Sequence, residues 1–257
     1  MLNKTSIPTL FTAQNLLFFD SLASTNTHAQ KLLEENHPPE GTAILTIDQT
    51  AGRGQTGSVW VSEPGMNVLC SFIFYPTFLE PTRQFLLNQV ISLAVIDALK
   101  KIIGQQFLIK WPNDIYFGEK KVAGILIENS IRGNSFVNSV VGIGLNVNQK
   151  IFPPEISNPI SLAQISNKNL INMEVFATLA IAIEQRYLQL RNEFSSANIQ
   201  KEYLNNLLGY DELREYKIGL NKIKAILKNV DETGRLLLSG EDGIKYTAWF
   251  KEIEFVF

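Results

Sequence analysis

Short apolar runs separated by polar, glycine-containing segments dominate the first 150 residues. The runs at 16–19, 42–48 and 67–75 have the length and the branched or aromatic content of strands. Between the first two runs, Ser24-Thr25-Asn26 places capping side chains just before apolar residues at helical spacing, which predicts the start of a helix. Residues 83–101 repeat apolar side chains at i, i+3 and i+4 and predict a second helix.

The pattern changes twice farther along the chain. Short strands continue to residue 148, with a hairpin turn at 117–120, and a long helical stretch is then expected at about 172–206. After Leu208, short alternating segments joined by turn residues predict a small β-barrel. We therefore expect an α+β fold, with a mixed β-sheet and helices at 1–208 and a separate β-domain at 209–257. The later strands are predicted at 107–111, 115–117, 121–128, 135–148, 222–230, 235–240 and 244–250.

Composition narrows the classes of function. The chain has 257 residues, of which 45% are hydrophobic, enough for one large domain and a smaller companion. Its 23 Lys and Arg against 25 Asp and Glu give a net charge of −2, so no global positive field favours nucleic acid, although a local basic patch stays open. The N-terminus lacks a signal-peptide core, and no apolar stretch reaches the roughly 20 residues of a membrane span. We expect a soluble, cytoplasmic protein with no DNA or membrane partner.

Few residues could bind a metal ion or form a covalent intermediate. Cys70 lies inside an apolar run and is expected to be a buried strand residue, so no disulfide forms within the chain. The two histidines, His28 and His37, have no partners at zinc spacing. We therefore expect no dedicated metal site built from protein side chains.

A glycine-rich segment, Gly52-Arg53-Gly54-Gln55-Thr56-Gly57, satisfies the G-x-G-x-x-G pattern of dinucleotide-binding loops. That loop must open into a helix, however, and here Ser-Val-Trp-Val-Ser-Glu-Pro-Gly follows instead. With Val59 the segment also fits the kinase pattern, but the chain has no H-R-D or D-F-G motif. What remains is a glycine loop carrying one arginine, suited to phosphate or carboxylate oxygens, with a solvated surface loop as the alternative.

Three further segments concentrate polar or glycine residues at strand ends. Lys110-Trp111-Pro112-Asn113-Asp114 joins a strand to a turn, where local backbone hydrogen bonding is the competing explanation. Lys121 stands at the mouth of an apolar strand that contains Gly124, and residues 142–148 read GIGLNVN. Glycines inside strands indicate either a bulge or the close approach of a ligand or another backbone.

In this order, the motifs STN, DQTAGRGQTGSVW, KWPND, KKVAGILIE and GIGLNVN closely resemble the catalytic domain of bacterial biotin protein ligases. The resemblance covers about residues 16–150, and the C-terminal segment is similar to the SH3-like domain of that family. It implies a mixed sheet like that of class II aminoacyl-tRNA synthetases. It also implies a two-step reaction in which biotin and ATP give biotinyl-adenylate, and the adenylate is then attacked by a lysine of a biotin carboxyl carrier protein. Residues 1–208 would form the catalytic domain.

The resemblance also implies roles for individual residues. Ser24, Thr25, Asn26 and Gln49 would line the biotin pocket and bind its ureido head. Arg53 would meet carboxylate and phosphate oxygens, and Lys121 would neutralise the charge shared by biotin and the α-phosphate. By the same resemblance, Gly52, Gly54 and Gln55 would bind the adenylate, Gly124, Gly144 and Asn146 would let the ligand lie against the sheet, and Trp60 would form an apolar wall. Mg²⁺ is expected with ATP, and Asn113 or Asp114 could assist it or guide the incoming lysine.

Two departures from the family pattern are visible. Many members carry further arginines in the loop, whereas this chain has Gln55, Thr56 and Ser58, which predicts weaker phosphate contacts and altered retention of the adenylate. Some members begin with a DNA-binding domain, whereas about 15 residues precede the first strand here, so we expect no repressor role. A lipoate-protein ligase and a non-catalytic biotin-binding protein are the competing functions. A homodimer stays open.

Overall fold

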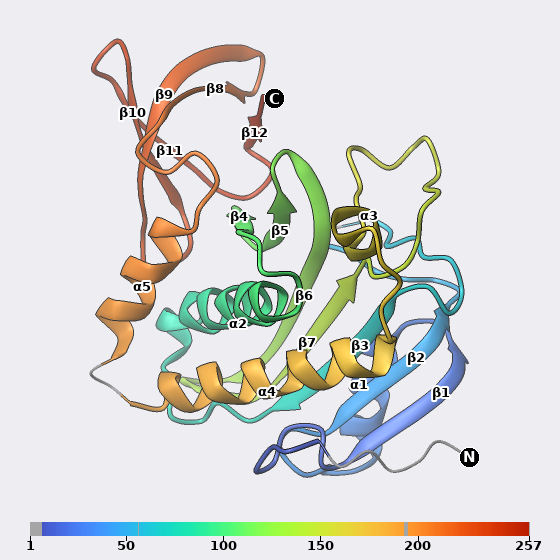
Figure 1. Cartoon of the computed structure of the whole chain (residues 1–257). Helices are drawn as coiled ribbons and strands as arrows, with labels where there is room; N and C mark the ends of the chain where they lie inside the picture. The colour runs from blue at the N-terminus through green and yellow to red at the C-terminus, as the bar shows by residue number, and fades with distance from the viewer. Residues whose placement is uncertain (1–6, 56, 193–194, 257) are drawn as a thin grey trace.

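A seven-stranded mixed sheet forms the larger part of the molecule (Figure 1). The computed structural model describes residues 7–55, 57–192 and 195–256. The strand order is β1-β2-β3-β7-β6-β5-β4, in which β1 and β2 are parallel and every other neighbouring pair is antiparallel. The predicted mixed sheet is confirmed. Its strands are β1 (Leu16–Leu22), β2 (Ala43–Gln49), β3 (Val68–Phe74), β4 (Leu108–Lys110), β5 (Asp114–Phe117), β6 (Lys120–Arg132) and β7 (Ser135–Leu145).

Helices cover the two faces of this sheet unequally. Alternate residues of β3 point to opposite sides: Cys70 and Phe72 join the main core with α2 (Phe85–Ile103) and α4 (Asn172–Leu190). Ile73 packs on the other side with Ala29 of α1 (Thr25–Glu35). Helix α1 makes its main strand contacts with β2, β3 and β7. On this side of the sheet, β6 and β5 are therefore left for other groups to cover.

A second, five-stranded antiparallel sheet follows the helices, in the order β11-β10-β9-β8-β12. It stands beside the β4–β5 end of the large sheet (Figure 1). The indole Nε1 of Trp111 donates to the carbonyl oxygen of Gly234 at 3.1 Å, and the Leu208 amide donates to the carbonyl of Ile109 at 2.8 Å, so backbone and side-chain bonds tie the two sheets together. The strands are β8 (Leu213–Ile218), β9 (Asn221–Val230), β10 (Leu236–Gly240), β11 (Lys245–Ala248) and β12 (Ile253–Phe255).

Several elements differ from the sequence-based expectation. The single helix expected at 172–206 is two helices, α4 and α5 (Ser196–Asn205). Near the break, the backbone amides of Asn192 and Ser195 donate to the carbonyl oxygens three residues earlier, at 3.1 Å and 2.9 Å, in place of the i→i−4 bonds of an α-helix. The short helix α3 (Leu162–Ser166) was not anticipated. Neither were β8, in which three of six residues are charged, and β12, which is only three residues long and so too short for a clear period. A 3₁₀ turn also precedes α2 at Pro81–Arg83.

No helix among the described residues combines the length and the apolar character that crossing a bilayer requires.

Candidate active site

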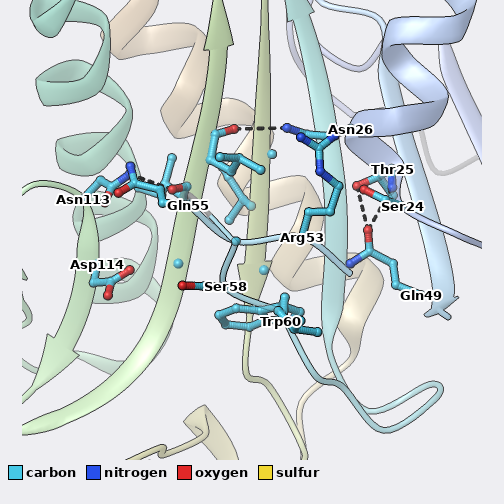
Figure 2. A pocket seen from close by; sticks show the side chains of 18 of the residues that line it. Ser24, Thr25, Asn26, Gln49, Arg53, Gln55, Ser58, Trp60, Asn113 and Asp114 are labelled. Carbon is cyan, nitrogen blue, oxygen red and sulfur yellow. Dashed lines mark hydrogen bonds between the residues drawn. The ribbon is translucent and has the colours of Figure 1, made fainter. Parts of the chain in front are cut away.

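A pocket lies on the α1 side of the large sheet, over β3, β7 and β6 (Figure 2). Residues of α1 and Gln49 form one side, and Asn113 and Asp114 form the other. The strand residues Gly124, Leu126, Gly142 and Gly144 line it and alternate with residues of the main core, so strand pleating sets which residues face the site. The complete lining is Ser24, Thr25, Asn26, Gln49, Arg53, Gly54, Gln55, Ser58, Val59, Trp60, Asn113, Asp114, Lys121, Gly124, Ile125, Leu126, Gly142, Ile143, Gly144 and Phe250.

The N-terminus of α1 brings buried polar side chains to the pocket. Ser24 is the N-cap residue, and its hydroxyl accepts from the Thr27 amide at 3.5 Å, which fixes where the helix begins. The Oε1 atom of Gln49, at the end of β2, accepts from the amide of Thr25 at 2.8 Å and from its hydroxyl at 3.2 Å. The Ser71 hydroxyl on β3 lies 2.7 Å from the Thr25 hydroxyl. These contacts give a preorganised set of donors and acceptors.

Asn26 connects this set to a charged pair. Its Oδ1 accepts from the Ser71 hydroxyl at 2.6 Å, and its Nδ2 donates to Oε2 of Glu128 at 2.8 Å. The other carboxylate oxygen of Glu128 lies 2.7 Å from Nη2 of Arg53. Figure 2 shows the Arg53 side chain extending from the loop toward Asn26. The arginine in the glycine-rich loop is therefore held beside the polar end of the pocket.

The glycine-rich loop folds back on itself as a tight hairpin. The Gly54 amide donates to the carbonyl of Ser58 at 2.8 Å, and the Trp60 amide donates to the carbonyl of Gly52 at 3.0 Å. A Cβ atom at Gly52 would lie 2.3 Å from the Trp60 carbonyl oxygen, so this close approach requires glycine. No helix follows the loop before β3, which rules out the Rossmann geometry.

The hairpin lays the indole of Trp60 over the strand glycines. Gly124 and Gly144 face each other across β6 and β7, and a Cβ added to them would lie 3.0 Å and 2.4 Å from Trp60 ring atoms. Both glycines line the pocket, and the Trp60 indole lies against them; their predicted contact with the ligand stays a prediction. Gly52 serves the hairpin and does not line the pocket. Among the residues that the structure describes, the buried Trp60 Nε1 donor has no hydrogen-bond partner.

Lys121 reaches the pocket from the first residues of β6. Its Nζ lies 2.7 Å from Oδ2 of Asp114 and 5.8 Å from the centroid of the Trp60 ring. Lys110, on β4, has other contacts: its Nζ lies 3.5 Å from the Tyr116 hydroxyl and 5.7 Å from the centroid of the Phe255 ring. Burial lowers the pKa of the Lys110 ammonium, with the Lys121 charge adding to that effect and Asp114 opposing it. The positive charge directed into the pocket therefore comes from Lys121 and Arg53.

Two predicted site asparagines have mainly structural contacts. Asn146 is 4% exposed and donates to the carbonyl oxygens of Lys121 and Ile160 at 3.4 Å and 3.2 Å, so it fixes the backbone at Lys121 and does not line the pocket. Its predicted place against the ligand stays a prediction. Asn113 does line the pocket, but its Nδ2 donates to the carbonyl oxygen of Ile125 on β6 at 2.6 Å. One donor of its side-chain amide is therefore used by the sheet.

Comparison with known proteins places this pocket in a family. The family model described as the biotin/lipoate A/B protein ligase family matches residues 18–146, which is 129 of 257 residues. The chain belongs to that family. It is 33% identical over 237 residues to the bifunctional ligase/repressor BirA of Bacillus subtilis, covering 90% of this chain and 71% of the relative. It is 30% identical to the biotin--[acetyl-CoA-carboxylase] ligase of Paracoccus denitrificans, covering 86% of this chain and 92% of that protein.

The same relationship appears in the fold. The biotin protein ligase from Aquifex aeolicus, solved in complex with biotin and ATP, superposes with a TM-score of 0.77 at 30% identity, covering 94% of this chain and 98% of that chain. The family match spans the pocket elements from β1 to β7. Gln55 and Ser58 both line the pocket, and Thr56 lies outside the described residues. Two of the three residues expected to weaken the phosphate contacts therefore lie in the site itself.

Seven residues of the pocket lining were not assigned from the sequence: Ser58, Val59, Ile125, Leu126, Gly142, Ile143 and Phe250. Ser71 and Glu128, which bind Asn26, were not assigned either. Gly142 carried a sequence signal as one of the paired glycines of its strand, and Glu128 as a charged residue after an apolar run. Within the described ranges, no group of three or more His, Cys, Asp or Glu side chains could hold a metal ion.

Proposed function

We propose that the chain is an ATP-dependent biotin protein ligase that forms biotinyl-adenylate and transfers biotin to a lysine of a biotin carboxyl carrier protein. The observation that carries the proposal is that Arg53 and Lys121, far apart in sequence, line one pocket with the hydrogen-bonding set of α1. A ureido group presents both donors and acceptors, and a carboxylate and phosphates present anionic oxygens, so the pocket has a counterpart for each end of the ligand.

In the first step, a biotin carboxylate oxygen forms a bond to the α-phosphorus of ATP while the bond to pyrophosphate breaks. Thr25, Asn26 and Gln49 would hold the ureido head. The guanidinium of Arg53 and the ammonium of Lys121 would stabilise the negative charge around the reacting oxygens, and charge held in place before the reaction lowers the barrier most. No protein nucleophile takes part in this step.

In the second step, the neutral amine of the carrier lysine attacks the carbonyl carbon of the adenylate, and AMP leaves. Asp114 lies beside Lys121 at the pocket edge and is placed to orient this amine. Mg²⁺ would arrive bound to the ATP phosphates, since no group of three or more His, Cys, Asp or Glu side chains among the described residues could hold it alone; Asn113 or Asp114 could assist. We further propose that residues 1–208 act as the catalytic domain and 209–257 as an SH3-like domain that contributes Phe250 to the pocket.

The proposal is tested by incubating purified protein with ATP, Mg²⁺ and biotin, and measuring pyrophosphate release before and after adding a carrier domain. The expected result is biotin-dependent pyrophosphate release, followed by a biotin-sized mass gain on the carrier. Replacing biotin with lipoate is the matched control, because a lipoate ligase would reverse the preference. Tight biotin binding without pyrophosphate release would instead identify a non-catalytic binder and overturn the proposal.

A further inference from the structure

Glu128 occupies an unusual position between two parts of the pocket. It lies on the pocket side of β6, two residues beyond Leu126, and 25% of its side chain is exposed. One carboxylate oxygen accepts from Asn26 at 2.8 Å and the other lies 2.7 Å from Nη2 of Arg53. A single carboxylate therefore joins the helix that supplies the polar pocket to the loop that supplies a cation.

We propose that Glu128 is a positioning residue that fixes Arg53 in the pocket and couples its position to Asn26. The inference rests on the proposed function for the identity of the ligand. Arginine has five N–H donors, of which the contacts to Glu128 and to the Thr27 hydroxyl at 3.4 Å use two, so three remain for ligand oxygens. The carboxylate thus restrains the side chain without consuming its capacity to bind an anion.

The surroundings of Arg53 explain why such a restraint is needed. Its loop is glycine-rich, and 47% of the Arg53 side chain is exposed, so the long side chain has many conformations to lose when ligand binds. Holding it beforehand reduces that entropy cost. Glycines on both sides of Arg53 cannot supply the restraint themselves. The ion pair with β6 supplies it from the rigid sheet.

The contact chain extends beyond the ion pair. Asn26 also binds Ser71, and Ser71 lies against Thr25, which binds Gln49. A ligand group that engages Asn26 therefore contacts the residue that shares the Glu128 carboxylate with Arg53. In the free protein, this arrangement should protect the Arg53 backbone as well as its side chain, because the hairpin and the ion pair must open together for a protease to reach it.

The first experiment replaces Glu128 with glutamine, which keeps the shape and an oxygen acceptor for Asn26 but removes the charge. In the absence of biotin and ATP, trypsin should cut the Arg53–Gly54 bond at least about three times faster in Glu128→Gln than in the native protein. Glu119→Gln, at the exposed β5–β6 turn, is the matched control and should cut at the native rate. Equal cleavage in all three proteins would overturn the proposal, whatever reaction the enzyme catalyses.

The second experiment measures whether Glu128 acts through Arg53. Biotin-dependent pyrophosphate release is compared in Glu128→Gln, Arg53→Ala and the double variant, with thermal unfolding of each as the check that the fold persists. Glu128→Gln should raise the KM for biotin and ATP about three- to tenfold with a smaller change in kcat, and should add little once Arg53 is absent. Fully additive losses would exclude the positioning role. A native protein without any biotin-dependent release would instead reject the proposed function while leaving the trypsin result to stand.

Discussion

Lys121 Nζ lies 2.7 Å from Oδ2 of Asp114, so the cation expected to meet the substrate oxygens is already paired with a carboxylate. The two side chains are 28% and 31% exposed, at the edge of the pocket rather than in its interior. An anionic ligand must share or replace this contact. The pair therefore holds the Lys121 side chain at the site while leaving it accessible.

Replacing Lys121 with methionine should slow adenylate formation about 100- to 1,000-fold, because one preorganised charge would be lost from the reacting centre. Methionine keeps the apolar stem against Trp60, so the fold should persist, with a thermal midpoint near that of the native protein. Biotin-dependent pyrophosphate release measures the effect. Lys120→Met, at an exposed position on the same strand, is the control. A native rate in Lys121→Met would remove this lysine from the mechanism.

The sequence was most informative where a residue type has few structural alternatives. The capping triplet predicted the start of α1, and the position of Lys121 at a strand mouth placed it correctly at the pocket. Pleating and cross-strand register decided the rest. Ser71, Gly142 and Leu126 are neighbours only because β3, β7 and β6 pair in one register, and that long-range pairing has no local signal in the sequence.

The strand glycines illustrate a different difficulty. The sequence left open whether Gly124 and Gly144 mark a bulge or a close approach, because glycine alone does not distinguish them. In the structure the indole of Trp60 lies against both, brought there by a hairpin whose geometry depends on Gly52 and Gly54. The contact depends on a residue more than 60 positions away along the chain, which no local pattern around the glycines could indicate.

Gly144→Ala should displace the Trp60 indole, because the new Cβ would lie 2.4 Å from its Cε2 atom. The expected loss of stability is about 1–3 kcal/mol, the usual cost of overpacking, accompanied by weaker biotin binding. Chemical denaturation and calorimetry measure the two effects. Adding Trp60→Leu should recover most of the stability by removing the clash. If Gly144→Ala alone keeps native stability and biotin affinity, the indole does not pack there in solution.

Phe250→Ala should make the reaction less efficient without preventing it. Phe250 lines the pocket from the turn after β11 and is 41% exposed, so its loss costs the core little but opens the site to water. The ratio of pyrophosphate released to biotin transferred should rise as adenylate is hydrolysed. Leu220→Ala, 99% exposed at the β8–β9 turn, should leave the ratio unchanged. An unchanged ratio in Phe250→Ala would show that this ring does not shield the adenylate.

Gln55→Arg should increase the retention of biotinyl-adenylate, since it adds a cation at a position that lines the pocket. A charge-assisted contact to the phosphate should slow adenylate dissociation about tenfold, corresponding to roughly 1.4 kcal/mol. The rate is measured by forming the adenylate on the enzyme, removing free ligand and following its release. Gln105→Arg adds the same charge on an exposed loop and controls for net charge. Because the effect is electrostatic and the site is open at its edge, the difference between the two variants should shrink at high salt. Equal release from both would show that position 55 does not reach the phosphate.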